Sequence, residues 1–295
     1  MTKSRSRLPS QYLFTVERLV ATYLYEPKLR DIFVEGVSDA AIIAEYRSAN
    51  SLDKLKIYNI NDVYIPSELV KFSFGSGNRG RLVALAHAIS EEVPVPPENV
   101  VCLADTDLDE EVTEAPACDR LWFTEHTCLE AGVFSMETLR WLFSTYFCKP
   151  ASTECLEDVI SICLRLYYIR SFKQSNCREI KWISPDDNLS IEAGRIKFDQ
   201  KGYLVKLLQY QGQKALLSSA DDYISEKVEN FVGDIRSRIH KDDFFVVTCW
   251  FGKKLGCSHE LCKSEVFSRV VLSHLRPDAM EHISHFRKIR EWACG

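Results

Sequence analysis

Apolar residues in the first half of the chain follow two alternating patterns, short continuous runs and runs with helical spacing. Short apolar runs bounded by turn residues predict buried strands, and recurrence every three or four positions predicts helices with one buried face. The predicted strands cover residues 31–35, 55–60, 100–105 and 118–125. The predicted helices cover residues 11–26, 38–50, 81–92 and 128–147, the last being long and amphipathic.

This alternation of strands and helices is typical of a parallel sheet covered by helices, so we predict an α/β fold. Binding sites in such sheets lie at the carboxyl ends of the strands. Two predicted strands end on an acid there, Glu35 in FVEG and Asp105 in VVCLAD. If these two strands are neighbours, the two carboxylates lie at one edge of the sheet.

The pattern changes near residue 150, after which helical spacing dominates. We therefore predict a first domain over 1–150, with its N-terminal helix, and a mostly helical C-terminal addition over 151–295. Within the addition, helices are predicted for 154–172, 221–239, 262–275 and 279–293, and a small hairpin for 179–199.

The composition is that of an ordinary soluble protein, with 46% hydrophobic and 27% charged residues in 295. No apolar stretch approaches the roughly 20 residues that span a bilayer, so no membrane association is predicted. The basic start MTKSRSRLPS is not followed by an apolar signal core. The eleven scattered cysteines favour reduced thiols, and together these features predict a cytoplasmic protein.

Negative charge is concentrated in one part of the sequence. Residues 91–137 hold thirteen Asp and Glu against one basic residue, Arg120, whereas the whole chain carries a net charge of −5. Concentrated acid on a mildly basic remainder suits a metal-dependent enzyme that acts on a polyanion. A solvated acidic surface loop explains the same charges equally well.

The acids that follow the third predicted strand have a spacing that suits a metal site. Asp105, Asp107 and Asp109 alternate along an extended turn, and carboxylate oxygens are the ligands that hard divalent cations prefer. Glu35 would join them from the first strand end. Asp109 could equally point to solvent, and Asp39, an accessory carboxylate by position, also suits a helix cap.

Taken together, these motifs resemble the Toprim signature. The resemblance rests on FVEGVSD around Glu35-Gly36, a glycine-rich turn before a helix, LADTDLD around Asp105-Thr106-Asp107, and a later acid in TCLEA, in that order. Among Toprim proteins the chain is most similar to small nucleases with a DUF4435-type domain, including the toxin subunit of the PARIS anti-phage system, and to OLD-class nucleases. The motifs cover about residues 28–140.

The resemblance implies a Toprim fold and a Mg²⁺-dependent endonuclease, with Mn²⁺ as an alternative cofactor. It implies Glu35 as general acid or base or metal contact, Asp105 and Asp107 as metal ligands, and Glu130 as a further ligand. Glu130 could instead be a helix-terminal acid favoured by the helix dipole. The resemblance also implies an ATPase partner subunit, an RNA substrate such as tRNA rather than DNA, and a role as a defence effector; pairing as a homodimer is common for nucleases of this size.

Substrate contacts are predicted for Arg79 and Arg81 in GSGNRGR, at a helix start where backbone N–H groups can meet phosphate. An ordinary turn is the alternative, and no Walker lysine is present. His126 could contact RNA or assist proton transfer, although a histidine at a strand end is often incidental. CSHELC at 257–262 is a weak zinc candidate, and the basic helix over 279–293 could touch nucleic acid or a partner.

A second hypothesis treats the chain as a non-catalytic subunit. Here the acid-rich run after Asp105 docks on a partner, such as an ATPase, and binds no metal. The two hypotheses differ in whether divalent cations stabilise the protein and whether the protein cleaves nucleic acid.

Overall fold

The computed structural model describes residues 12–71, 77–93, 99–108, 117–273 and 280–295. Contacts within the chain define two compact units. The first comprises 1–106, 110–125 and 277–295, and the second comprises 107–109 and 126–276. These units differ from the consecutive domains 1–150 and 151–295, because the first unit includes the C-terminal segment; the division at residue 150 stays a prediction about sequence domains.

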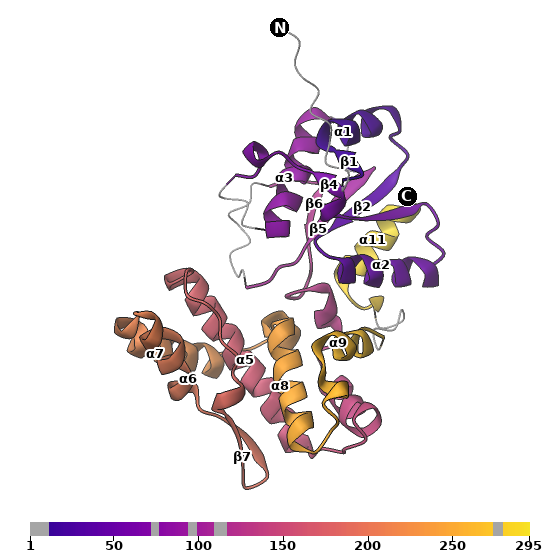
Figure 1. The fold of residues 1–295 in the computed structure, drawn as a ribbon. Coiled ribbons are helices and arrows are strands. Elements are labelled where there is room, and N and C mark those ends of the chain that lie inside the picture. Colours follow the sequence, from indigo (N-terminus) through magenta and orange to yellow (C-terminus); the bar gives the residue numbers. More distant parts are fainter. Residues whose placement is uncertain (1–11, 72–76, 94–98, 109–116, 274–279) are drawn as a thin grey trace. The chain divides into compact units, whose positions relative to one another are not determined.

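A four-stranded parallel sheet forms the first unit (Figure 1), as predicted. Its strand order is β3 (Leu55–Asn59), β2 (Arg30–Val34), β5 (Val100–Ala104) and β6 (Leu121–Phe123). All five residues of β5 and four of the five in β2 are buried. Strands buried on both faces need helices on both sides, which explains their nearly unbroken apolar sequences.

Helices cover both faces of this sheet (Figure 1). On one face, α1 (Val16–Tyr25) and α3 (Gly77–Glu92) share a core with Phe33 and Cys102. Successive strand residues point to opposite faces, so Ile32 turns to the other face, where α2 (Val37–Ala49) and α11 (Ser284–Cys294) lie. A two-stranded parallel pair, β1 (Phe14–Thr15) and β4 (Val63–Tyr64), completes the unit.

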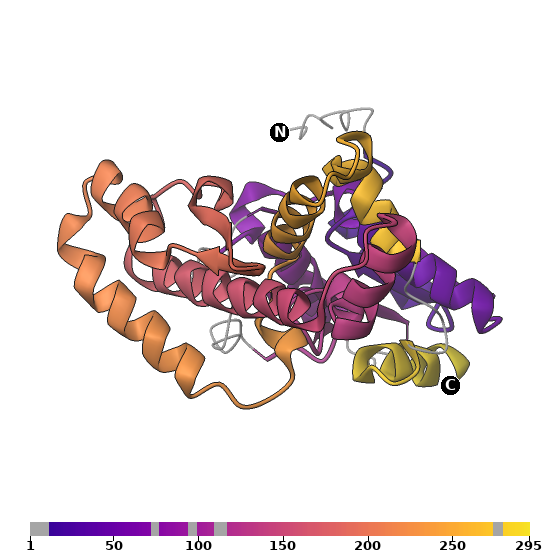
Figure 2. The same cartoon turned by 90° about the horizontal axis from the view of Figure 1, so that it is seen from below.

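In the residues that the structure describes, the second unit is helical apart from one hairpin, as the sequence pattern predicts. The helix α5 (Thr153–Asn176) is the longest and contacts α4, α7 and α8 (Figure 2). The remaining helices are α4 (Met136–Trp141), α6 (Gln200–Leu208), α7 (Leu217–Glu229), α8 (Lys241–Lys254) and α9 (Ser264–Ser273). The hairpin pairs β7 (Leu189–Glu192) with β8 (Arg195–Phe198) in antiparallel register.

A buried ion pair joins α5 to α8. The Arg170 guanidinium donates from Nε to Asp243 Oδ2 at 2.6 Å and from Nη2 to Oδ1 at 2.9 Å, and it lies 3.9 Å from the Trp182 ring centroid. Burial raises the pKa of Asp243, and the guanidinium opposes that rise. Because both charges are desolvated, removing either side chain would leave the other as an uncompensated buried charge and would destabilise the fold.

The predicted continuous helix over 128–147 is wrong. The structure has a 3₁₀ helix (Leu129–Val133), then α4, then a π-helical turn (Leu142–Tyr146). The break occurs at Ser135, whose extended backbone and Oγ, accepting from Thr138 N–H at 3.2 Å, start a new helix. A serine cap of this kind ends one helix and begins the next even inside an apolar pattern.

Other predicted boundaries shift for similar local reasons. The first helix begins at Val16 rather than 11, because Thr15 Oγ1 accepts from Arg18 N–H and caps it. The helix predicted over 221–239 ends at Glu229, before Gly233 with its φ of +142°. The helices α6 and α8 were not predicted. Among the described residues, no helix is both long enough and apolar enough to cross a membrane.

One buried acid in the first unit gives the fold a testable pH dependence. Asp31, in β2, is 5% exposed, and its Oδ2 accepts a hydrogen bond from Tyr23 O–H at 3.0 Å. Burial raises the pKa of Asp31 to about 6, although the Tyr23 hydrogen bond and Lys56 lower it and Glu26 raises it further. The unfolded carboxyl titrates near its ordinary value of about 3.9.

Between these two values the folded state binds the proton more tightly, so the contribution of Asp31 to stability is full well below pH 4 and is lost as the pH rises through 6. We expect the contribution of Asp31 to the unfolding free energy of wild type to fall by about 2 kcal/mol between pH 4.5 and 7.5, a fall that Asp31→Asn lacks. Urea unfolding of both proteins at pH 4.5 and 7.5 measures the difference. An equal pH dependence in the two proteins would contradict it.

Candidate metal centre

Glu35 and Asp105 meet at one edge of the sheet because β2 and β5 are neighbours. The two strands are parallel, with Val34 paired to Leu103, so both acids follow directly at the carboxyl ends. The Glu35 side chain reaches across, and its Oε1 accepts a hydrogen bond from the Asp105 backbone N–H at 3.0 Å. The predicted adjacency of these two strand ends is therefore confirmed. Asp105 is buried and Glu35 half-buried.

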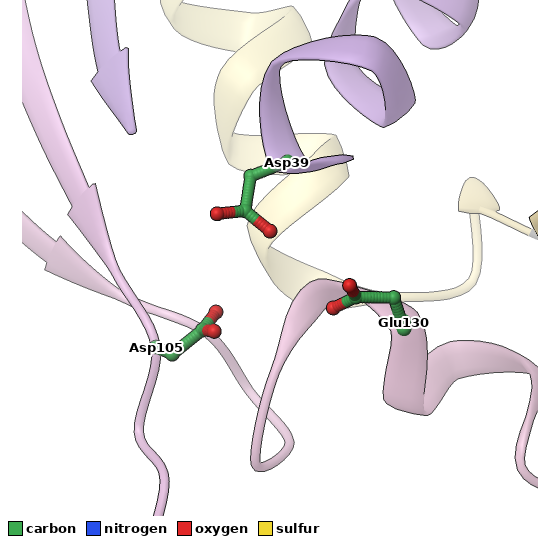
Figure 3. Close-up of side chains that lie close together, drawn as sticks. All are labelled: Asp39, Asp105 and Glu130. Carbon is green, nitrogen blue, oxygen red and sulfur yellow. The ribbon is translucent and has the colours of Figure 1, made fainter. Parts of the chain in front are cut away.

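Asp39 brings a second buried carboxylate to Asp105 (Figure 3). One oxygen from each lies within 4.8 Å of the other. A six-coordinate Mg²⁺ holds its oxygens at about 2.1 Å, so oxygens on opposite sides of the ion are about 4.2 Å apart. The Asp39–Asp105 pair therefore has the donor type that a hard divalent cation requires, and its limit of 4.8 Å is close to that span.

The position of Asp39 follows from the start of α2. The helix begins at Val37 with Gly36 as its cap residue, and the Gly36 N–H donates to Asp39 Oδ2 at 2.8 Å. A Cβ on Gly36 would lie 3.1 Å from that oxygen, so glycine permits the close approach. We predicted Asp39 as an accessory carboxylate or a helix cap; the cap residue is Gly36, and Asp39 is the third residue of the helix. Asp39 follows Glu35 by four residues, with the strand end and the helix start between them. This spacing is the sequence feature that could have indicated that Asp39 lies near the site.

The residue after Asp105, Thr106, is hydrogen-bonded to Thr124, which follows the end of β6. Thr106 N–H donates to Thr124 Oγ1 at 3.0 Å, and Thr106 Oγ1 donates to the Thr124 carbonyl at 2.5 Å. These two hydrogen bonds restrict the backbone on the C-terminal side of Asp105. The Glu35 contact restricts the same residue from the other neighbouring strand.

The predicted substrate residues Arg79 and Arg81 lie in the first turns of α3 and have different surroundings. The Arg81 guanidinium donates to Asn61 Oδ1 at 2.8 Å and to the carbonyls of Ile60 and Val63, which ties α3 to the chain after β3. The Arg79 guanidinium lies 5.8 Å from the Phe123 ring centroid, at the end of β6. Substrate contact by either arginine stays a prediction, and residues 72–76 of the glycine-rich turn lie outside the described residues.

The second residue of α3, Asn78, contacts Glu35 directly. Asn78 Nδ2 donates to the Glu35 carbonyl at 2.8 Å. The backbone just past β2 is therefore held by a side chain of α3 at the point where the strand stops. This contact gives the N-terminal turn of α3 a structural function at the site.

The other predicted site residues belong to the second unit. Asp107 has a left-handed backbone, φ +51°, and its N–H donates to the Thr127 carbonyl at 2.8 Å. His126 is buried, and Glu130, also drawn in Figure 3, is 3% exposed with Lys241 Nζ 3.5 Å from its Oε1. Asp109 lies outside the described residues. The metal roles of Asp107, Asp109 and Glu130 and the substrate role of His126 stay predictions.

The cysteine cluster in the second unit does not support zinc. Among the described residues, no group of three ligating side chains containing Cys257, His259 or Cys262 lies within coordination reach. Cys249 and Cys262 share a hydrogen bond, and burial raises the pKa of both thiols. Thiols held in the protonated form are poor zinc ligands.

No protein-family model matches this chain, and comparison with curated proteins finds no significant match. What the chain does must therefore be inferred from its own side chains. The first unit supplies Glu35, Asp39 and Asp105 at one sheet edge, held by backbone and side-chain hydrogen bonds.

The Asp39–Asp105 pair predicts stabilisation by divalent cations. A cation that binds the folded site and not the unfolded chain should, at a concentration of about 100 times its Kd, add about 2.7 kcal/mol to the unfolding free energy and raise the melting temperature by several degrees. We expect Mn²⁺ or Mg²⁺ to shift wild type and to leave Asp105→Asn unshifted. Differential scanning calorimetry with and without the cation measures both.

Asp53→Asn is the matched control, because Asp53 is exposed on the turn before β3 and its loss removes the same charge. This variant should retain the full cation-dependent shift. An equal shift in wild type and Asp105→Asn would place the bound cation elsewhere.

Proposed function

We propose that this chain is a Mg²⁺-dependent endonuclease of the Toprim class, which hydrolyses phosphodiester bonds in nucleic acid. The observation that carries the proposal is the meeting of Asp39 and Asp105 within 4.8 Å, beside a Glu35 side chain that touches the Asp105 backbone. The sequence motifs around Glu35 and Asp105 support the assignment to this class. Mn²⁺ has the same ligand preference and could replace Mg²⁺.

The residues of the first unit fit this role in their chemistry. Asp39 and Asp105 are buried oxygen donors that would hold the cation, and Glu35 is a half-buried acid that could hold or release a proton beside it. A bound divalent cation supplies Lewis-acid stabilisation of charge on a scissile phosphate and lowers the pKa of water. The mildly basic remainder of the chain, outside 91–137, would favour a polyanionic substrate.

The biological setting is proposed from the resemblance. It favours RNA, such as tRNA, as substrate, an ATPase partner subunit that restrains the enzyme, and a role as effector in anti-phage defence. A cytoplasmic location and a homodimer agree with that setting. The alternative of a non-catalytic subunit that docks its acidic segment on the ATPase is kept as an outcome of the tests.

Cleavage by the purified full chain tests the activity. We expect cuts in tRNA or DNA pools with Mg²⁺ or Mn²⁺ and none with EDTA, and a loss of at least about a hundredfold in Glu35→Gln and Asp105→Asn. Asp53→Asn should cleave as wild type does. Mapping the cut ends by sequencing identifies the nucleic acid and the position of cleavage.

A cellular assay tests for activity that the purified chain does not show. Expression of wild type should slow growth, and Glu35→Gln at equal protein level should not. Retained cleavage in both acid variants would refute the proposed site. No cleavage, no toxicity and no cation-dependent stabilisation would favour the docking subunit instead.

A further inference from the structure

The C-terminal helix α11 packs in the first unit, against the elements that carry the candidate metal centre. Phe286 and Ile289 are fully buried, and the Phe286 ring centroid lies 4.9 Å from that of Tyr46 in α2. Trp292 meets Trp122 of β6 edge to face at 5.7 Å. The helix thus contacts α2, which contains Asp39, and β6, which ends beside Thr124.

A pair of hydrogen bonds joins α11 to the chain just after β6. Glu125 N–H donates to His285 Nδ1 at 3.1 Å, and Ser284 N–H donates to Glu125 Oε2 at 2.5 Å. The cap residue of α11, Ile283, offers no side-chain acceptor to the helix. The Glu125 carboxylate therefore caps the helix from 159 positions away in the sequence, where the helix dipole favours a negative charge.

The same segment holds the chain beside Asp105. Thr124 N–H donates to the Ala104 carbonyl at 3.0 Å, and Thr124 Oγ1 and its carbonyl accept both hydrogen bonds from Thr106. A continuous path of hydrogen bonds and single backbone steps thus runs from His285 through Glu125 and Thr124 to Thr106. It ends on the residue next to Asp105.

This path is needed because β6 is short and lies at the end of the strand order. Its three residues end at Phe123, opposite Ala104, and in the part of the chain that the structure describes no further strand pairs with β6 on its outer side. The hydrogen bonds from α11 to Glu125 position this segment in place of a further strand. Apolar packing of Phe286 and Ile289 alone would dock the helix without aligning the backbone of Glu125.

We propose that His285 is a positioning residue for the metal centre, acting through Glu125, Thr124 and Thr106 on Asp105. This inference rests on the proposed function, since it assigns His285 a role in the geometry of that same site. His285 accepts at Nδ1, so asparagine, whose Oδ1 can stand near the same position, should replace it. Alanine cannot, because it offers no acceptor to Glu125 N–H.

Mn²⁺ affinity of the full chain, measured by isothermal titration calorimetry, tests the proposal without requiring activity. We expect His285→Ala to weaken Mn²⁺ binding about tenfold, as loss of supporting partners around ligands commonly does, and His285→Asn to restore most of it. His282→Ala is the control, because His282 is exposed just before the helix and should leave the affinity unchanged. Without metal, amide hydrogen exchange at Thr106 should be faster in His285→Ala than in wild type, His285→Asn or His282→Ala.

A second substitution keeps the test independent of whether His285→Ala folds. Thr124→Val removes the Oγ1 acceptor for Thr106 N–H while keeping the side-chain shape, and it should weaken Mn²⁺ binding similarly. Because both residues act along one path, the double variant should lose less than the product of the two single effects.

Each failure points to a different conclusion. Unchanged Mn²⁺ affinity in folded His285→Ala or in Thr124→Val, or an equal loss in His285→Ala and His285→Asn, would overturn the positioning role. If Asp105→Asn binds Mn²⁺ as wild type does, the proposed metal centre itself fails. If Asp105→Asn loses binding and His285→Ala does not, the metal centre stands and the positioning inference fails.

Discussion

The parallel pairing of β2 with β5 is the constraint on which the site depends. Its register sets Val34 against Leu103, so Glu35 and Asp105 emerge one and two residues later at the same sheet edge. A slip of one residue would turn Asp105 to the opposite face, because side chains alternate along a strand. Burial of both strands on both faces opposes such a slip, since it would exchange which apolar residues face each helical layer.

Placing carboxylates together at this edge has a cost that local structure partly offsets. Asp39 and Asp105 repel one another when both are charged, and burial strengthens that repulsion. Asp39 stands in the first turn of α2, where the helix dipole and the Gly36 N–H favour a carboxylate. The same side chain can therefore stabilise the start of a helix and serve as a metal ligand, which explains why its cap role and its site role are difficult to separate from sequence.

The sequence predicted those parts of the fold that depend on local pattern. The bounds of strands with unbroken apolar runs, such as β2 and β5, were predicted to within one residue. Once these bounds were known, the acids at the strand ends could be identified as candidate site residues. The break at Ser135 was missed because an apolar pattern continued across a serine cap. The contacts of Glu125 with Ser284 and His285 join residues some 160 positions apart, and no spacing rule in a single sequence reveals such a pair.

Because of these distant contacts, the structural unit that carries the site includes the C-terminal segment. The candidate centre draws its carboxylates from the first third of the chain, yet the unit that holds them also contains 277–295. Tyr46 O–H donates to Glu281 at 2.7 Å, Arg30 Nε donates to the Trp292 carbonyl at 3.0 Å, and Phe286 fills a fully buried position. Residues 1–150 alone would expose the surfaces of α2 and β6 that α11 covers and would lack Ser284 and His285, which bond to Glu125. The candidate metal centre therefore belongs to a unit assembled from both ends of the sequence.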